Sequence, residues 1–213
     1  MCIRDRLGVF GYCVEDGQTV NRRADWTVGV KMSKSKDGDY YIHGMSRFQL
    51  RSGPRDNKIL QVGHRDGTDC HIVMAADVGS AGNFQFQEFA KKVVSEGLIC
   101  KKDPMPVNKS KLTRAEPLLT AIQNGLVTIV ESSFEPEELK RFYREFEIFD
   151  GERSLAGSGK WDDIVDACAS AFNYLAKETI LPSFTLGTSQ PQQTRMSQVM
   201  SSSAPVFGES VGK

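Results

Sequence analysis

The sequence lacks the features that mark membrane, secreted and strongly basic proteins. It contains no run of about 18 apolar residues, so we expect no membrane-spanning helix. Its first residues carry no apolar stretch of the length that a signal peptide needs, so we expect a protein that is not secreted. The 27 basic and 27 acidic residues cancel, which excludes nucleic-acid binding through overall charge but leaves room for a local basic groove.

Cysteine and histidine are few, and their spacing excludes the common metal and disulfide motifs. The five cysteines are scattered without a C-x-x-C pair, which indicates buried free thiols in a reducing cytosol. The three histidines match neither H-x-H nor H-E-x-x-H. A phosphate-binding G-x-x-x-x-G-K-S/T loop is also missing, because the segment GSGKW at 157–161 lacks the first glycine and the final Ser or Thr. We therefore expect no ATP hydrolysis.

Short apolar strands and amphipathic helices alternate along most of the chain. The apolar patterns predict strands at Leu7–Val14, Trp26–Met32, Asp39–Leu50, His71–Ala76, Gly97–Cys100 and Val127–Val130. Helical spacing predicts helices at Pro54–Gly63, Phe84–Glu96, Leu112–Asn124, Glu135–Phe149 and Asp162–Leu181. Because consecutive strands come first and strands then alternate with helices, the order favours a three-layer α/β/α domain with a mixed central sheet.

The two ends of the chain differ from this pattern. Residues 1–6, MCIRDR, resemble the translated end of a transposon used to prepare sequencing libraries, so we interpret them as an artefact. Residues 183–213 hold seven Ser, four Gln and three charged residues, a composition typical of disorder. We therefore divide the chain into an artefact at 1–6, one domain at 7–181 and a Ser/Gln-rich tail at 182–213.

Aspartates stand at the ends of several core elements. They are Asp25 before a strand, Asp77 after a strand, and Asp162, Asp163 and Asp166 at the start of the last helix. Taken singly, each has a structural explanation, such as a helix N-cap or an ordinary strand–turn–helix junction. Together they would repel, since two charges 4 Å apart interact by about 4 kcal/mol at an effective dielectric of 20. A hard divalent cation such as Mg²⁺ or Mn²⁺ relieves that repulsion, and two such ions can clamp a phosphodiester.

Six segments, taken in order, resemble one known family. They are DWTVGV, DGDYYI, ADVGSAG, NKSKLTRAEP, NGLVTIVE and WDDIVDACASAFNYL, and they run from about Asp25 to Leu175. This series resembles the C-terminal nuclease domain of the phage terminase large subunit. The resemblance implies an RNase H-like fold and a metal-dependent endonuclease that cuts concatemeric viral DNA during packaging in the host cytoplasm. It also implies a portal protein and a small terminase subunit as partners. The chain itself is expected to form oligomers only in the assembled motor.

The resemblance assigns roles residue by residue. It makes Asp77, Asp162 and Asp163 catalytic, and adds Asp25 and Asp166 to them as ligands of Mg²⁺ or Mn²⁺, with two ions expected. The SKxxRA segment is implied to face double-stranded DNA through Lys109, Lys111 and Arg114. For these three basic residues, a solvated loop with a few salt bridges is the alternative explanation.

One departure from the family pattern leaves other functions open. The family carries a catalytic Asp on its first strand, where this chain has Tyr12 and Cys13. We therefore expect an N-terminally truncated domain that lacks one metal ligand and has impaired activity. That departure favours a non-catalytic DNA- or portal-binding packaging module as an alternative. Another RNase H-like nuclease, such as a Holliday-junction resolvase, is a second alternative, but the SKxxRAEP block favours the terminase.

Overall fold

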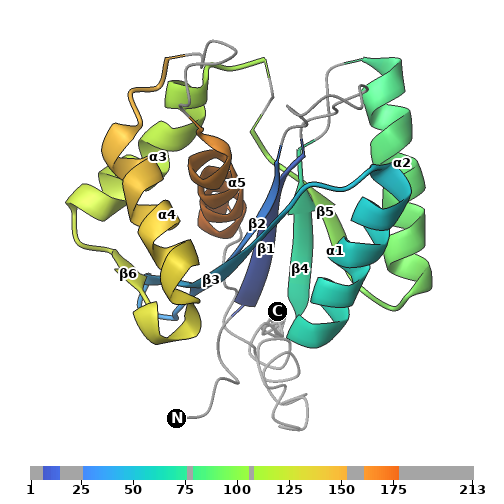
Figure 1. The fold of residues 1–213 in the computed structure, drawn as a ribbon, viewed down its shortest axis with the longest axis horizontal. Coiled ribbons are helices and arrows are strands. Elements are labelled where there is room, and N and C mark those ends of the chain that lie inside the picture. The colour runs from blue at the N-terminus through green and yellow to red at the C-terminus, as the bar shows by residue number, and fades with distance from the viewer. Residues whose placement is uncertain (1–6, 15–25, 76–78, 106–107, 153–160, 178–213) are drawn as a thin grey trace, which may run out of the picture. The chain divides into compact units, whose positions relative to one another are not determined.

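The computed structural model describes residues 7–14, 26–75, 79–105, 108–152 and 161–177 (Figure 1). Within them, one sheet has the strand order β5-β4-β1-β2-β3-β6. Its strands are β1 (Leu7–Val14), β2 (Thr27–Lys34), β3 (Tyr40–Phe48), β4 (Cys70–Met74), β5 (Cys100–Lys102) and β6 (Val127–Ile129). Strand β2 runs antiparallel to both β1 and β3, whereas the β1–β4, β4–β5 and β3–β6 pairs are parallel. The sheet is therefore mixed, as the sequence predicts.

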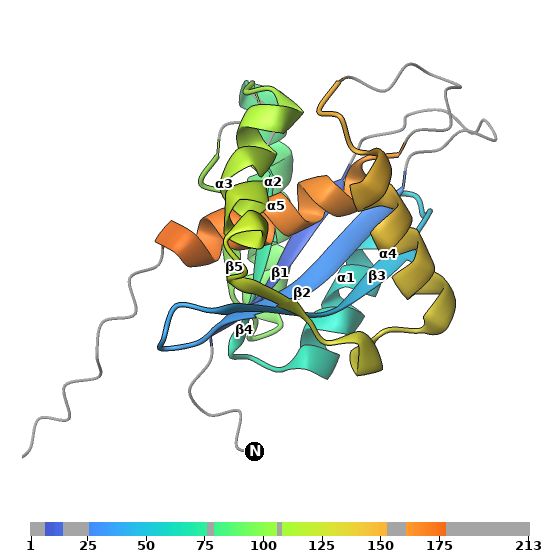
Figure 2. The same ribbon diagram turned by 90° about the vertical axis from the view of Figure 1, so that its left-hand side faces the viewer.

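Helices cover both faces of this sheet (Figures 1 and 2). They are α1 (Ser52–Asp66), α2 (Ser80–Ser95), α3 (Lys111–Gln123), α4 (Pro136–Ile148) and α5 (Asp163–Lys177), with a short 3₁₀ turn η1 (Glu131–Ser133) before α4. Helices α1 and α2 share one hydrophobic core with β4, and α3, α4 and α5 share the other with β2 and β3. These two cores on opposite faces confirm the expected three-layer α/β/α arrangement.

The central element is α5, which lies against the sheet between α3 and α4 (Figure 2). Every residue from Asp163 to Leu175 is buried, including the polar ones. Small side chains at Ala167, Cys168 and Ala171 let the helix approach the strands closely, and the larger Ile164 and Phe172 fill the adjoining core. Because the helix is buried from its first residue, Asp163 and Asp166 at its start are buried with it.

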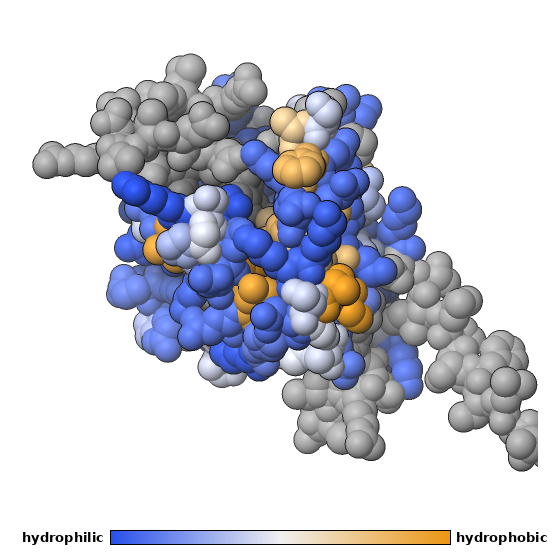
Figure 3. All heavy atoms as spheres, turned by 90° about the vertical axis from the view of Figure 1, so that its right-hand side faces the viewer, coloured by the Kyte–Doolittle hydropathy of each residue, from blue (hydrophilic) through white to orange (hydrophobic). Residues whose placement is uncertain are grey.

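The outer surface of the α1–α2 layer is different in character. Figure 3 shows a mostly hydrophilic face with a few separate apolar spots. Exposed apolar side chains in this layer include Phe84 and Val94, both on α2. Scattered single residues of this kind are usual on protein surfaces. None of the described helices is long and apolar enough to cross a membrane.

The predicted elements are present in the described residues, with shifted ends. Helix α2 begins at Ser80 rather than Phe84, because Gly79 takes a φ of 116° and the helix starts directly after it. Strand β5 begins at Cys100 rather than Gly97, since Gly97, with a φ of 74°, closes the end of α2. The predicted artefact at 1–6 and the tail at 182–213 lie outside the described residues.

Candidate functional site

Three predicted acidic residues lie at the N-terminal turn of α5. Asp162 directly precedes the helix, and Asp163 and Asp166 lie in its first turn. All three are buried. Buried carboxylates this close in the chain raise one another's cost of ionisation, so the site needs cations or protons. Burial is the largest cause of the raised pKa of Asp166, and the charge of Asp162 adds to it.

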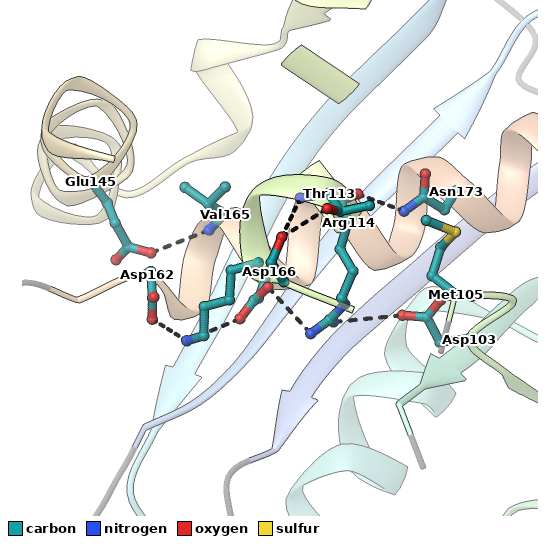
Figure 4. Close-up of polar contacts among 11 residues, drawn as sticks. Asp103, Met105, Thr113, Arg114, Glu145, Asp162, Val165, Asp166 and Asn173 are labelled. Carbon is teal, nitrogen blue, oxygen red and sulfur yellow. Dashed lines mark hydrogen bonds and ion pairs between the residues drawn. The ribbon is translucent and has the colours of Figure 1, made fainter. Parts of the chain in front are cut away.

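The N-terminal end of α5 is capped by a residue of another helix, Glu145 of α4 (Figure 4). The backbone N–H groups of Ile164 and Val165 both donate to Glu145 Oε1, at 2.5 and 3.2 Å. Because Glu145 satisfies these amides, the side chain of Asp162 is not needed for that task. In the structure, Glu145 therefore takes the N-cap role that was one explanation for Asp162. Burial raises the pKa of Glu145 to about 7, while the two amides and Arg47 oppose that rise.

Two basic residues of α3 neutralise the acids. Lys111 Nζ lies 2.6 Å from Asp162 Oδ1 and 3.2 Å from Asp166 Oδ2. Arg114 Nη1 lies 3.5 Å from Asp166 Oδ1. Ser110 caps α3 by accepting a hydrogen bond from the Thr113 N–H, so Lys111 and Arg114 project from its first turn toward α5. We refer to Asp162, Asp163 and Asp166 as the acidic turn. The SKxxRA segment therefore supplies both a helix cap and two counter-ions for the acidic turn.

The three basic residues expected to face DNA differ in exposure. Arg114 is 8% exposed and its guanidinium is occupied by ion pairs, which gives it a structural task in the described fold. The side chain of Lys111 is 23% exposed, so its ammonium group is still partly open to solvent. Lys109 is exposed. Contact of these residues with DNA stays a prediction, and Lys109 and Lys111 are the better placed for it.

Asp103, which the sequence analysis missed, ties the strands to this network. Its Oδ2 lies 3.8 Å from Arg114 Nη2, and its N–H donates to the carbonyl of Met74 at the end of β4. Met74 pairs with Tyr12 of β1. The C-terminal ends of β1, β4 and β5 therefore lie at the same edge of the sheet as the acidic turn. The sequence did contain a signal for Asp103, because this acidic residue directly follows a strand, as the sequence predicts for Asp77.

The chemistry of these donors suits a hard divalent cation. Asp162 Oδ2 is buried and accepts no hydrogen bond from the described residues, so one oxygen is left without its usual partner. Carboxylate oxygens are the ligands that Mg²⁺ and Mn²⁺ prefer. Within the described residues, no group of three or more His, Cys, Asp or Glu side chains is arranged to hold a metal ion. Asp25 and Asp77, the other two predicted ligands, lie outside those residues.

Comparison with known families bears directly on this site. A model of the terminase RNaseH-like domain matches residues 16–175. The chain belongs to the terminase RNaseH-like domain family. This membership confirms the family and the RNase H-like α/β fold expected from the sequence. The match to the terminase RNaseH-like domain begins after β1, so Tyr12 and Cys13 lie outside it.

Two further comparisons add little to the assignment as a terminase RNaseH-like domain. No curated protein matches the sequence. A crystal structure of fowlpox virus resolvase in complex with Holliday junction DNA is similar, with a TM-score of 0.44 and 8% identity. That similarity covers 79% of this chain and 97% of the resolvase chain.

Proposed function

We propose that this terminase RNaseH-like domain is a divalent-metal-dependent endonuclease that hydrolyses phosphodiester bonds of concatemeric viral DNA during packaging. The observation that carries the proposal is the gathering of Asp162, Asp163 and Asp166 at the edge where β1, β4 and β5 end. Chemistry in α/β folds is concentrated at that edge. Family membership supports the same activity.

Aspartate side chains would hold the metal. We propose Asp162, Asp163 and Asp166 as ligands together with Asp77 and Asp25, with two ions of Mg²⁺ or Mn²⁺. A bound ion of this kind activates water and stabilises charge on a phosphodiester. The protein's own contribution is to fix the ligands. Glu145 holds the first turn of α5, and Lys111 lies between Asp162 and Asp166, where its positive charge limits their repulsion.

The substrate and partners follow from the family. We propose double-stranded DNA as the substrate, with the exposed Lys109 and partly exposed Lys111 near its backbone. In the host cytoplasm, a portal protein and a small terminase subunit would complete the packaging motor. The absence of an acid at Tyr12 and Cys13 is expected to weaken cleavage, since a first-strand ligand would be missing.

Plasmid cleavage with Mn²⁺ tests this proposal. We expect nicked and linear products from the wild-type chain, and at least a 100-fold loss of rate for Asp163→Asn and Asp77→Ala, on the order of the effect of removing a ligand or its support. Glu147→Gln, which changes an exposed carboxylate on α4, is the matched control and should cleave normally. Absence of cleavage at every metal concentration, or cleavage that survives both Asp substitutions, would contradict the nuclease proposal.

A non-catalytic packaging module is the second candidate, favoured by Tyr12 and Cys13 on β1. In that case the chain would bind duplex DNA in a gel-shift assay and cleave none of it. A resolvase would instead cut a four-way junction in preference to linear duplex. Running the three substrates in parallel therefore separates the terminase nuclease from both alternatives.

A further inference from the structure

A pocket of about 470 Å³ opens beside the acidic turn, between α4, β3 and the start of α5. Its lining includes Trp161 and Ile164, which flank Asp162 and Asp163 in the chain. Four basic side chains also line it, namely Arg47, Lys140, Arg141 and Arg144. The pocket thus places positive charge next to the carboxylates that we propose as metal ligands.

Three of these four cations form no ion pair within 4 Å among the described residues. Lys140 is paired with Glu137, at 2.7 Å. Arg141 and Arg144, which are exposed, and Arg47, which is partly buried, form no ion pair with any described side chain. The nearby carboxylate of Glu145 is occupied by the amides of α5. The pocket therefore has unbalanced positive charge at its wall.

Arg47 shows that this charge is not simply solvated. Its guanidinium lies 3.5 Å from the centre of the Trp26 ring, and its Nε is buried without a hydrogen-bond acceptor in the described part of the chain. A buried donor without an acceptor destabilises the fold. Burial and the nearby Arg141 lower the pKa of Arg47, while the charges of Glu145 and Asp163 oppose that shift. An anion in the pocket would supply the missing acceptor and relieve the repulsion between the two guanidinium groups.

Helical spacing explains how α4 serves two faces at once. Phe142 and Phe146 pack into the core, whereas Arg141 and Arg144, three residues apart, turn toward the pocket. Guanidinium groups bind phosphate oxygens in a bidentate manner, which makes arginine the usual choice for a fixed phosphate contact. Trp161 is exposed at the same rim and offers an aromatic face to a base or sugar.

We propose that this arginine pocket binds a backbone phosphate of the DNA strand next to the phosphodiester that is cleaved. The proposal rests on the proposed nuclease function, because DNA is its ligand. The pocket would hold the strand so that the neighbouring phosphodiester lies over Asp162 and Asp163. Arg141 and Arg144 would contact the phosphate oxygens, and Arg47 would donate from the base of the pocket.

The test is DNA binding measured without metal, so that cleavage plays no part. Fluorescence anisotropy of a short labelled duplex is recorded over a range of salt concentrations for the wild-type chain and for Arg141→Ala/Arg144→Ala. We expect about tenfold weaker binding near 0.1 M salt, and a slope of log affinity against log salt that is smaller by about 2. The control is Lys58→Ala/Lys91→Ala, which removes the same charge from exposed positions on α1 and α2 and should change neither quantity.

The outcomes separate the pocket from the nuclease. Binding of the arginine variant that equals binding of the lysine control would overturn the pocket proposal, even if the chain cleaves DNA. Arginine-dependent binding in a chain that never cleaves would support the pocket as a phosphate site and contradict the nuclease. In a cleaving chain, we further expect the arginine variant to raise KM several-fold, because both arginines would contact the substrate. Circular dichroism checks that both double variants are folded.

Discussion

Replacing Glu145 with glutamine should change how the stability of the fold depends on pH. Folding raises the pKa of this carboxyl from an ordinary value of 4.5 to about 7, chiefly because it is buried. Between those two values the folded chain binds more protons than the unfolded chain. The free energy of unfolding therefore falls as the pH rises through this window, and the cost of the buried charge is complete above pH 7.

The size of the effect follows from the two pKa values. Each pH unit of difference corresponds to about 1.4 kcal/mol, so the wild-type chain should lose up to about 3 kcal/mol of stability between pH 4.5 and pH 8. Glutamine keeps the shape of the side chain and can still accept from the amides of Ile164 and Val165. Glu145→Gln should therefore be the more stable chain at pH 8, and should lose that advantage near pH 5.

Urea unfolding, followed by far-ultraviolet circular dichroism in a metal-free buffer, measures this at several pH values. The quantity to compare is the difference between the wild-type chain and Glu145→Gln, because other groups titrate equally in both. Glu145→Ala is the matched control, because it also lacks the titrating carboxyl but removes the cap of α5. It should show the same pH dependence as Glu145→Gln and lie about 1–2 kcal/mol below it at every pH. A difference between wild type and Glu145→Gln that is constant from pH 5 to pH 8 would refute the reasoning.

Two further substitutions and one chemical modification test the packing around α5. Arg114→Met leaves Asp103 and Asp166 buried beside an apolar chain and should cost about 3–5 kcal/mol in urea unfolding, with Arg114→Lys recovering part of it. Cys168 is fully buried and burial raises its pKa well above the ordinary value, so iodoacetamide at pH 8 should modify it only after unfolding, as mass spectrometry can show. Leu118→Ala should lower the free energy of unfolding by about 2–5 kcal/mol, because Leu118 is completely buried in the core under α5.

Each of these has an outcome that would contradict it. A loss below about 1 kcal/mol for Arg114→Met would mean that its ion pairs are not formed in solution. Modification of Cys168 at the rate of a free thiol would place α5 nearer the surface than the structure does. A Leu118→Ala chain as stable as the wild type would mean that α3 does not pack as described.

Regular patterns made most of the fold predictable. The apolar run at His71 identifies β4 and the alternation after Trp26 identifies β2, although β2 is buried on both faces rather than on one. The grouping of Asp162, Asp163 and Asp166 was predictable for the same kind of reason, since helical spacing alone brings them onto one turn.

Residues whose role depends on a distant partner were not predictable. Glu145 lies on a strongly charged helix, where a glutamate normally faces solvent, and its partners on α5 lie 19 and 20 residues away. The sequence predicts DNA contact for Arg114, which stays untested, but it does not reveal that the packing of α3 on α5 buries this residue against Asp166 and Asp103. Spacing along one helix cannot reveal which neighbouring helix covers it.

The network around α5 explains how a chain of zero net charge can still present a charged site. Glu145 of α4 satisfies the helix amides, so the aspartates need not cap their own helix. Lys111 and Arg114 of α3 pair with Asp162 and Asp166, so the carboxylates stay close despite their repulsion. Positive charge that α4 does not use for pairing is left at the adjoining pocket, on Arg141 and Arg144. Acidic groups at the start of α5 and basic groups on α4 thus lie side by side. The net charge of the whole chain adds them to zero and hides the local charges that a metal ion and a phosphate would recognise.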